Sequence, residues 1–226
     1  MTLSNSQTTR LGDRLRQGMM EEADLSLLDE FRQTFSDLDE QAYPMIQGTL
    51  SSRIDYTLTK RKRKTQQSIV DKLIRQPKLR LPQMQDVAGC RIVVQGGSQA
   101  AQQIKDLLKG VFASQQWQVE VKSRDKDGYR AIHIIVKAGK KFYEIQLRTY
   151  AQDIWANLIE RLCDEDNTLK YGGTEQEQPL MNRLKVLAER FLDIDQNAHT
   201  VTFTHCQKQI EGAIRDVLSH WTQSHQ

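Results

Sequence analysis

Residues 129–149 read YRAIHIIVKAGKKFYEIQLRT, and this stretch decides the fold. Tyr129–Lys137 and Lys140–Thr149 are rich in β-branched and aromatic residues, and only Ala138-Gly139 separates them. Two such runs around a short connection that contains glycine predict an antiparallel β-hairpin. The rest of the chain is therefore interpreted around a sheet that contains this hairpin.

The hairpin should present one apolar and one polar face, because successive side chains of a strand point to opposite sides. In its second strand the apolar residues are Tyr143, Ile145 and Leu147, and the polar residues are Glu144, Gln146 and Arg148. The first strand adds Tyr129, Arg130 and His133. An ordinary half-buried strand shows the same alternation, so the pattern alone leaves a binding site and a solvated face equally open.

Two more strands and several helices are predicted around the hairpin. Val87–Val94 and Trp117–Lys122 have strand character, and residues 1–20 are polar and expected to be loosely ordered. Apolar spacings of three and four predict helices over 21–38, from Pro44 toward Lys60, and over 65–76, 98–113, 150–164, 179–196 and 199–221. The predicted fold class is α+β: a mixed sheet of about four or five strands with helices packed on it.

Charge is unevenly distributed along this nearly neutral chain of 226 residues and net charge +3. The 21 residues from Lys60 to Arg80, here called the cationic segment, contain nine basic residues and one acid, Asp71, and carry +8. The rest of the chain has 23 basic and 28 acidic residues, or −5. This distribution indicates one local polyanionic partner and excludes a generally basic nucleic-acid coat protein.

Targeting signals, cysteines and common nucleotide motifs narrow the class of protein. The sequence has no run of about 18 apolar residues that could span a membrane and no apolar signal-peptide core between Met1 and Gly18. Cys90, Cys163 and Cys206 lie far apart, match neither a disulfide framework nor zinc spacing, and are expected to be buried thiols. We therefore expect a cytoplasmic protein without a membrane partner. It has no dinucleotide fingerprint or Walker-type loop, which excludes Rossmann and P-loop enzymes.

Two further patterns suit phosphate and metal binding. Lys64, Ser68 and Lys72 are spaced by four, which places them on one face of a helix, and a row of ammonium groups suits a triphosphate. Asp86 precedes a strand that contains Arg91, so its carboxylate could hold a divalent metal beside a phosphate-binding arginine. A solvated basic helix and a plain turn aspartate are the alternatives.

Together these signals resemble the synthetase domain of the RelA/SpoT family, the alarmone synthetases, whose fold is nucleotidyltransferase-like. The matching motifs are Lys64-x3-Ser68-x3-Lys72, Asp86-Val-Ala-Gly-Cys-Arg91, Gly128-Tyr129-Arg130-Ala-Ile-His133, Glu144-Ile-Gln146-Leu-Arg148-Thr149 and Trp155-Ala156. The resemblance implies three parts: a polar segment and helix over 1–45, a synthetase domain over 46–178 and a C-terminal helical extension over 179–226.

The resemblance also implies an activity and a role for each motif. It implies an ATP-dependent pyrophosphokinase that transfers the β,γ-pyrophosphate of ATP to the 3′-hydroxyl of GDP or GTP, making (p)ppGpp-type alarmones. Asp86 and Glu144 would be catalytic and hold Mg²⁺, and Glu144 would complete the metal site or accept the hydroxyl proton. ATP would be bound by Lys62, Lys64, Ser68, Lys72 and Arg91. The acceptor would be bound by Tyr129, Arg130, His133, Gln146 and Arg148, with the Tyr129 ring stacked on its base.

Departures from the family pattern leave other acceptors open. Lys62 stands where the family usually has arginine, and Ile159-Glu160-Arg161 replaces a familiar Glu-His pair. The segment Leu169-Lys170-Tyr171-Gly172-Gly173 resembles toxic small synthetases, some of which pyrophosphorylate the 3′ CCA end of tRNA. The alternatives are thus tRNA or an adenine nucleotide as acceptor and, less favoured, a non-catalytic nucleotide or RNA sensor.

The last two predicted helices are amphipathic. Their apolar residues are Leu184, Leu187, Phe191 and Ile194 in the first helix and Ile210, Ile214, Val217 and Trp221 in the second. We expect these faces to pack on the protein's own core. The alternative is a surface for a homo-oligomer or for a neutralising antitoxin protein.

Overall fold

The computed structural model describes residues 3–18, 20–50, 55–126, 128–165, 175, 178–198 and 203–223. At its centre lies a five-stranded sheet with the strand order β1-β2-β5-β4-β3. The strands are β1 (Tyr56–Lys60), β2 (Ala88–Val94), β3 (Gln118–Lys126), β4 (Tyr129–Ala138) and β5 (Lys141–Thr149). Because β2 runs parallel to β5 and the other pairs are antiparallel, the sheet is mixed, and the predicted α+β class is confirmed.

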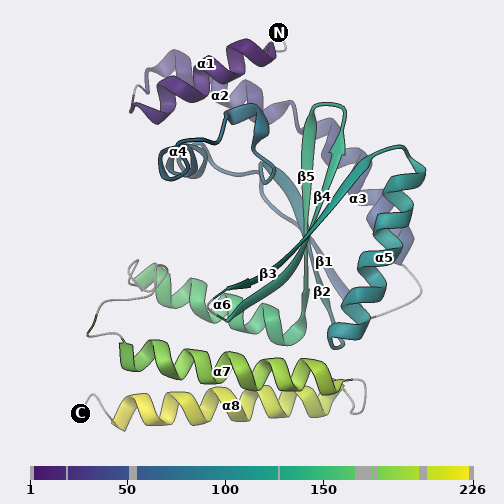
Figure 1. Ribbon diagram of the computed structural model, residues 1–226, viewed down its shortest axis with the longest axis vertical. Helices are drawn as coiled ribbons and strands as arrows, with labels where there is room; N and C mark the ends of the chain where they lie inside the picture. The colour runs from purple at the N-terminus through teal and green to yellow at the C-terminus, as the bar shows by residue number, and fades with distance from the viewer. Residues whose placement is uncertain are drawn as a thin grey trace.

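Helices flank both sides of the sheet. α3 (Ser36–Leu50) and α5 (Ser98–Ser114) pack on one face, and α4 (Gln66–Arg75) and α6 (Tyr150–Glu165) lie on the opposite side (Figure 1). α1 (Asn5–Arg16) and α2 (Glu22–Gln33) pack on α4 at one end of the molecule. α7 (Gln178–Asn197) and α8 (Phe203–Gln223) stack beyond α6 at the other end (Figure 1).

The predicted hairpin separates the core from the polar face. Tyr143, Ile145 and Leu147 of β5 are fully buried and pack into the main core beneath α3 and α5. Burying one such large apolar side chain stabilises the fold by roughly 1.5–3 kcal/mol. The pleat therefore directs the alternate residues of β5 to the face that α4 and α6 flank, called here the polar face.

The prediction that residues 1–20 are loosely ordered is wrong for the described residues 3–18, most of which form α1. Ser4 accepts a hydrogen bond from the Gln7 backbone N–H, and the Gln7 side chain accepts one from the Ser4 N–H, which forms a capping box at the start of α1. Leu11 and Leu15, one turn apart, are buried. A short helix with so few apolar residues is marginal alone, so its order depends on tertiary packing that the sequence pattern does not display.

The predicted helices over 21–38 and from Pro44 toward Lys60 are also wrong in their bounds. The first one breaks at Thr34 and Phe35, where the Lys141 ammonium donates to the Thr34 carbonyl. Pro44 lies inside α3, not at its start. The chain then forms β1, an edge strand that pairs antiparallel with β2. Its alternation over five residues is too short to distinguish from a helix end by pattern alone.

The C-terminal helices pack on the protein's own fold, as expected. Leu184, Leu187 and Phe191 of α7 and Ile210 of α8 are buried, in clusters that join α6 to both helices. The side chains of Val217 and Trp221 lie outside the described residues. Among the helices described, none combines the length and the apolar character needed to cross a membrane. The division into parts at 45/46 and 178/179 stays a prediction.

Candidate active site

Glu144 lies at the centre of the polar face. Its strand β5 is flanked by β2 and β4, and Glu144 stands beside Gly89 in the parallel pair. The carboxylate is only 7% exposed and accepts three hydrogen bonds: from Arg61 Nη1 at 2.9 Å, from His133 Nδ1 at 2.8 Å and from Gln146 Nε2 at 3.1 Å. The buried carboxylate is thus held between donors from β4, from β5 and from Arg61, the residue that follows β1.

The environment of Glu144 favours its ionised form. Burial acts to raise the pKa of the carboxyl, but the hydrogen bond from His133 and the charge of Arg61 outweigh burial. The pKa of Glu144 is therefore lowered from its ordinary value. A carboxylate in this state can accept a proton or bind a cation.

A chain of hydrogen bonds extends from Glu144 to the end of β5. The Tyr129 hydroxyl lies 3.1 Å from His133 Nε2 and accepts from Arg148 Nη2, also at 3.1 Å. The Arg148 guanidinium, 2% exposed, also lies over the Tyr129 ring and pairs with Asp153 Oδ1 at 3.0 Å. Because guanidinium only donates, Tyr129 can give its own proton to His133, whose other nitrogen donates to Glu144.

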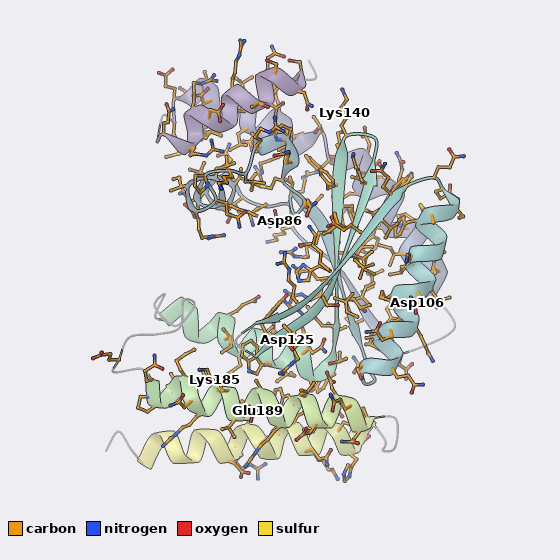
Figure 2. All side chains as sticks on the ribbon, in the orientation of Figure 1. Asp86, Asp106, Asp125, Lys140, Lys185 and Glu189 are labelled. Carbon is orange, nitrogen blue, oxygen red and sulfur yellow. The ribbon has the colours of Figure 1, made fainter. Side chains whose placement is uncertain are left out.

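Asp86 is the second carboxylate of the polar face, and two lysines hold it. Lys72 Nζ of α4 lies 2.8 Å from Asp86 Oδ1, and Lys64 Nζ lies 3.2 Å from Asp86 Oδ2. Burial acts to raise the pKa of Asp86, but the two ammonium groups outweigh it, so the pKa is lowered. Figure 2 shows Asp86 on the side of the sheet that faces α4.

Lys64 and Lys72 meet at one carboxylate although only Lys72 is in a helix. α4 begins at Gln66 with Thr65 as its N-cap, so Lys64 precedes the helix. The Lys64 backbone N–H donates to the Val87 carbonyl at 2.9 Å, which fixes the segment beside Asp86. The predicted face of three donors is therefore wrong as a helix face, while the two lysines are brought together by tertiary contacts.

The basic residues of the cationic segment divide between the N-terminal helices and the polar face. Lys60 pairs with the buried Asp39 of α3 at 3.7 Å, and Arg63 donates to Ser36 and Gln33. Arg61 instead reaches Glu144 on the polar face. Part of the local positive charge is thus used to join β1 to the N-terminal helices, and part is directed to the site.

A pocket of about 450 Å³ opens beside these groups at the β1 edge of the sheet. Arg91 lies in its wall and pairs with Asp153 at 3.5 Å. Its other wall residues include Thr57, Thr59, Arg61, Lys62 and Asp153. A volume of this size suits a nucleoside-sized ligand, and its cationic rim suits the negative charge of a nucleotide.

The structure brings most of the predicted residues together, with two exceptions. Ser68 is exposed in the first turn of α4, where its hydroxyl accepts from Thr65 Oγ1. Arg130 points to α7, donating to the Ala188 carbonyl at 2.9 Å. The other predicted residues lie on the polar face or at the pocket: Lys62, Lys64, Lys72, Asp86, Arg91, Tyr129, His133, Glu144, Gln146 and Arg148.

Arg61 and Asp153 are site residues that the sequence prediction missed. Arg61 continues the alternation of Thr57 and Thr59, so recognising β1 as a strand would have placed it beside Glu144. Asp153 follows β5 by one helical turn and pairs with both Arg91 and Arg148. No local pattern marks that residue, because its partners come from other elements.

The donor set suits a divalent cation bound together with phosphate. Asp86 and Glu144 offer carboxylate oxygens, and the buried Gln146 Oε1 has no hydrogen-bond partner among the described residues. Within the described part of the chain, no group of three or more His, Cys, Asp and Glu side chains forms a complete metal cage. Mg²⁺ is commonly held by one or two carboxylates plus substrate phosphates, so two carboxylates fit it.

Comparison with known proteins finds a family similarity over the central segment. Residues 61–162 match the family model described as the region found in RelA / SpoT proteins. Proteins of Mycobacterium bovis and Mycobacterium tuberculosis, both described as uncharacterised, are 32% identical over 166 residues. That match covers 71% of this chain and 59% of theirs, so the chain spans under two thirds of the length of these relatives.

Solved structures show the same fold at low sequence identity. A GTP pyrophosphokinase family protein from Streptococcus pneumoniae matches with a TM-score of 0.59 at 20% identity, covering 84% of this chain and 98% of that one. Small alarmone synthetase 1 from Bacillus subtilis, bound to its product pppGpp, matches with a TM-score of 0.56 at 23% identity, covering 74% and 90%. Residues 61–162 are thus similar to the region found in RelA / SpoT proteins, and the chain has a fold like that of the small alarmone synthetases.

Proposed function

We propose that this protein is an ATP-dependent pyrophosphokinase that transfers the β,γ-pyrophosphate of ATP to the 3′-hydroxyl of GDP or GTP. The observation that carries the proposal is the pair of ionised carboxylates, Asp86 and Glu144, on a polar face rich in Lys and Arg. Phosphoryl-type transfer needs positioning and charge stabilisation more than covalent chemistry. This face offers cations for the phosphates and carboxylates for a metal and a proton.

ATP would lie along the β1 side of the polar face. Lys64 and Lys72 converge at Asp86, and ammonium groups at that spot bind phosphate oxygens as point charges. The pocket of about 450 Å³ that Arg61, Lys62 and Arg91 line would hold the nucleoside. Mg²⁺ at Asp86 and Glu144 would neutralise charge on the transferred group when it is bound.

The acceptor would lie on the β4 side, where Tyr129 and His133 border Glu144. The Tyr129 ring stacks on the acceptor base, an interaction worth about 1–3 kcal/mol. Glu144 takes the proton of the 3′-hydroxyl while the hydroxyl oxygen of the acceptor bonds to the β-phosphorus of ATP. The bond from that phosphorus to the α-phosphate bridge breaks, and AMP leaves. Arg61 and Arg148 stabilise the negative charge around this exchange.

The contacts that the basic residues of the cationic segment make within the protein favour a nucleotide acceptor over tRNA. An RNA backbone would need Lys60 to Arg63 as a continuous basic strip. Lys60 and Arg63 are instead engaged with Asp39, Ser36 and Gln33 of the N-terminal helices. The Leu169–Gly173 segment, which resembles the toxic synthetases, lies outside the described residues.

Transfer from labelled ATP tests the proposal directly. The purified protein is incubated with Mg²⁺ and ATP labelled at the β-phosphate, and separately with GDP, GTP, adenine nucleotides and deacylated tRNA. We expect label in GDP or GTP. Label in tRNA alone would make the CCA end the acceptor and refute the guanine nucleotide.

The variant Glu144→Gln separates chemistry from binding in the same assay. It preserves the size of the side chain and removes the proton acceptor, so transfer should be abolished while ATP binding, measured by calorimetry, persists. Retained turnover in this variant would show that Glu144 is not the base. Absence of transfer to every acceptor by the wild type would favour a nucleotide sensor.

A further inference from the structure

The N-terminal helices α1 and α2, which lie outside the matched residues 61–162, donate side-chain hydrogen bonds to the backbone of the cationic segment. Arg32 Nε of α2 donates to the carbonyl oxygen of Lys64 at 2.8 Å. The backbone N–H of Lys64 donates to the Val87 carbonyl. Hydrogen bonds therefore fix the Lys64 backbone on both sides of the atom that carries its side chain. The side chain that emerges from this point ends on Asp86.

A second arginine holds the other end of α4. Arg16 Nε of α1 donates to the Leu73 carbonyl at 3.2 Å, and its Nη2 donates to the Leu79 carbonyl. The carbonyls of the last turn of a helix have no partner within the helix, so a guanidinium there replaces water and ties the helix end to α1. Lys72, the residue before Leu73, ends on the same Asp86.

Each of the two arginines also makes an ion pair within its own helix. Arg16 pairs with Asp13 at 2.9 Å and Arg32 pairs with Asp29, each one turn earlier in its own helix. Both guanidinium groups are mostly buried, with 21% of each side chain exposed. A third contact, from Gln66 Nε2 to the Leu25 carbonyl at 2.9 Å, joins the start of α4 to α2.

We propose that Arg16 and Arg32 are positioning residues for the donor nucleotide, which set Lys64 and Lys72 at the separation that a triphosphate requires. The proposal rests on the assignment of the two lysines to ATP. Neither arginine contacts the polar face, so each acts through the backbone to which it donates. The N-terminal helices are then a functional part of the ATP site and not an appendage of the family region.

The test compares variants that remove these backbone contacts with variants that remove only neighbouring ion pairs. Arg16→Gln and Arg32→Gln lose the carbonyl contacts at either end of α4. Their controls are Arg14→Gln, which breaks the pair of Arg14 with Asp24 between α1 and α2, and Asp29→Asn, which leaves the Arg32–Lys64 bond intact. Thermal melts establish that each variant folds, and the two arginines are tested separately so that one unfolded variant does not end the experiment.

Three measurements are made on each folded variant: KM for ATP and for the acceptor, kcat, and hydrogen exchange of the α4 amides. Arg16→Gln and Arg32→Gln should each raise KM for ATP roughly tenfold, because a guanidinium–carbonyl hydrogen bond that holds a lysine is lost. kcat at saturating ATP and KM for the acceptor should stay within about twofold, and Arg32→Lys should recover part of the loss. Amides of α4 should exchange faster, whereas those of β2 should not change.

The outcomes separate this proposal from the proposed function. Wild-type KM for ATP in both arginine variants overturns the positioning role, and so does an equal rise in KM in the two controls, which would indicate general loosening of the N-terminal helices. Calorimetry with Mg²⁺-ATP measures nucleotide binding even if the protein transfers no pyrophosphate. If the wild type binds ATP without transferring pyrophosphate, the proposed function fails, yet weaker binding in the arginine variants alone still supports their positioning role.

Discussion

The Nδ1 atom of His133 lies 2.8 Å from Oε1 of Glu144, although the two residues do not face each other in the sheet. The register of β4 and β5 places His133 opposite Gln146, and Glu144 opposite Ile135. The imidazole therefore reaches diagonally across the strand pair, a distance that a long side chain can span. This contact joins the Glu144 carboxylate to the aromatic and cationic groups at the far end of the hairpin.

Replacing His133 with leucine should move the acid limb of the pH–kcat profile to higher pH. Glu144 must be ionised to accept a proton, so activity falls as pH drops through its pKa. The His133 hydrogen bond lowers that pKa, and its loss leaves burial to raise it. The pH dependence of kcat measures the shift. His205→Leu on α8 serves as the control, and an unmoved limb in the His133 variant would exclude a role for Glu144 ionisation in the rate.

Gly89→Ala should disrupt the junction of β2 and β5. A Cβ atom at this position would lie 2.0 Å from the Glu144 carbonyl oxygen, and backbone on both sides prevents relief. We expect a loss of about 3 kcal/mol in the free energy of unfolding, measured by urea denaturation.

Gly110→Ala in α5 is the matched control for that substitution. Nothing lies within 4 Å of its added Cβ, and it removes a glycine from a helix interior. It should therefore raise stability by about 0.5–1 kcal/mol. If Gly89→Ala were as stable as the wild type, β2 and β5 would not approach as closely as the structure has them.

The division of the cationic segment predicts opposite phenotypes for two lysines. Lys72→Gln removes a donor at Asp86 and should raise KM for ATP roughly tenfold or more. Lys60→Gln loses the pair with Asp39 and should leave KM for ATP unchanged. It should lower the free energy of unfolding by about 1–3 kcal/mol, because the buried Asp39 carboxyl loses a partner. Steady-state kinetics and thermal melts of both variants test this. A similar rise in KM for both would mean that the whole segment contacts the nucleotide.

Asp195→Asn should stabilise the protein above neutral pH. Burial raises the pKa of Asp195 to about 6, despite the hydrogen bonds from Thr149 and Gln152. Because the folded state binds this proton more tightly than the unfolded state, stability falls as pH rises from the ordinary carboxyl range through about 6. The asparagine carries no charge to bury, so its gain should be on the order of 2 kcal/mol at pH 8. Unfolding curves at pH 5 and pH 8 check this. The free energy of unfolding of the wild type should fall between the two pH values because Asp195 ionises, and the variant should lack that contribution.

The sequence by itself determined the hairpin, the alternation of β5 and the identity of the two carboxylates. Glu144, Gln146 and Arg148 share one face because the pleat of a strand has a period of two, which is a local property. The spacing of the motifs likewise indicated the similarity to RelA/SpoT proteins over the central segment, since the residues of each motif lie close together in the chain. Tertiary contacts did not alter these predictions.

Only the tertiary structure decided which basic side chains lie beside the two carboxylates and which contacts hold them there. Arg61 reaches Glu144 across 83 residues of chain, and Arg16 reaches the Leu73 carbonyl across 57. Five residues of β1 and the sparse apolar pattern of α1 carry too little local signal, because their order comes from burial against distant elements. The directions of Lys60, Arg61 and Arg63 were therefore open in the sequence. They became distinct only in the folded chain, where Lys60 and Arg63 meet the N-terminal helices and Arg61 meets Glu144.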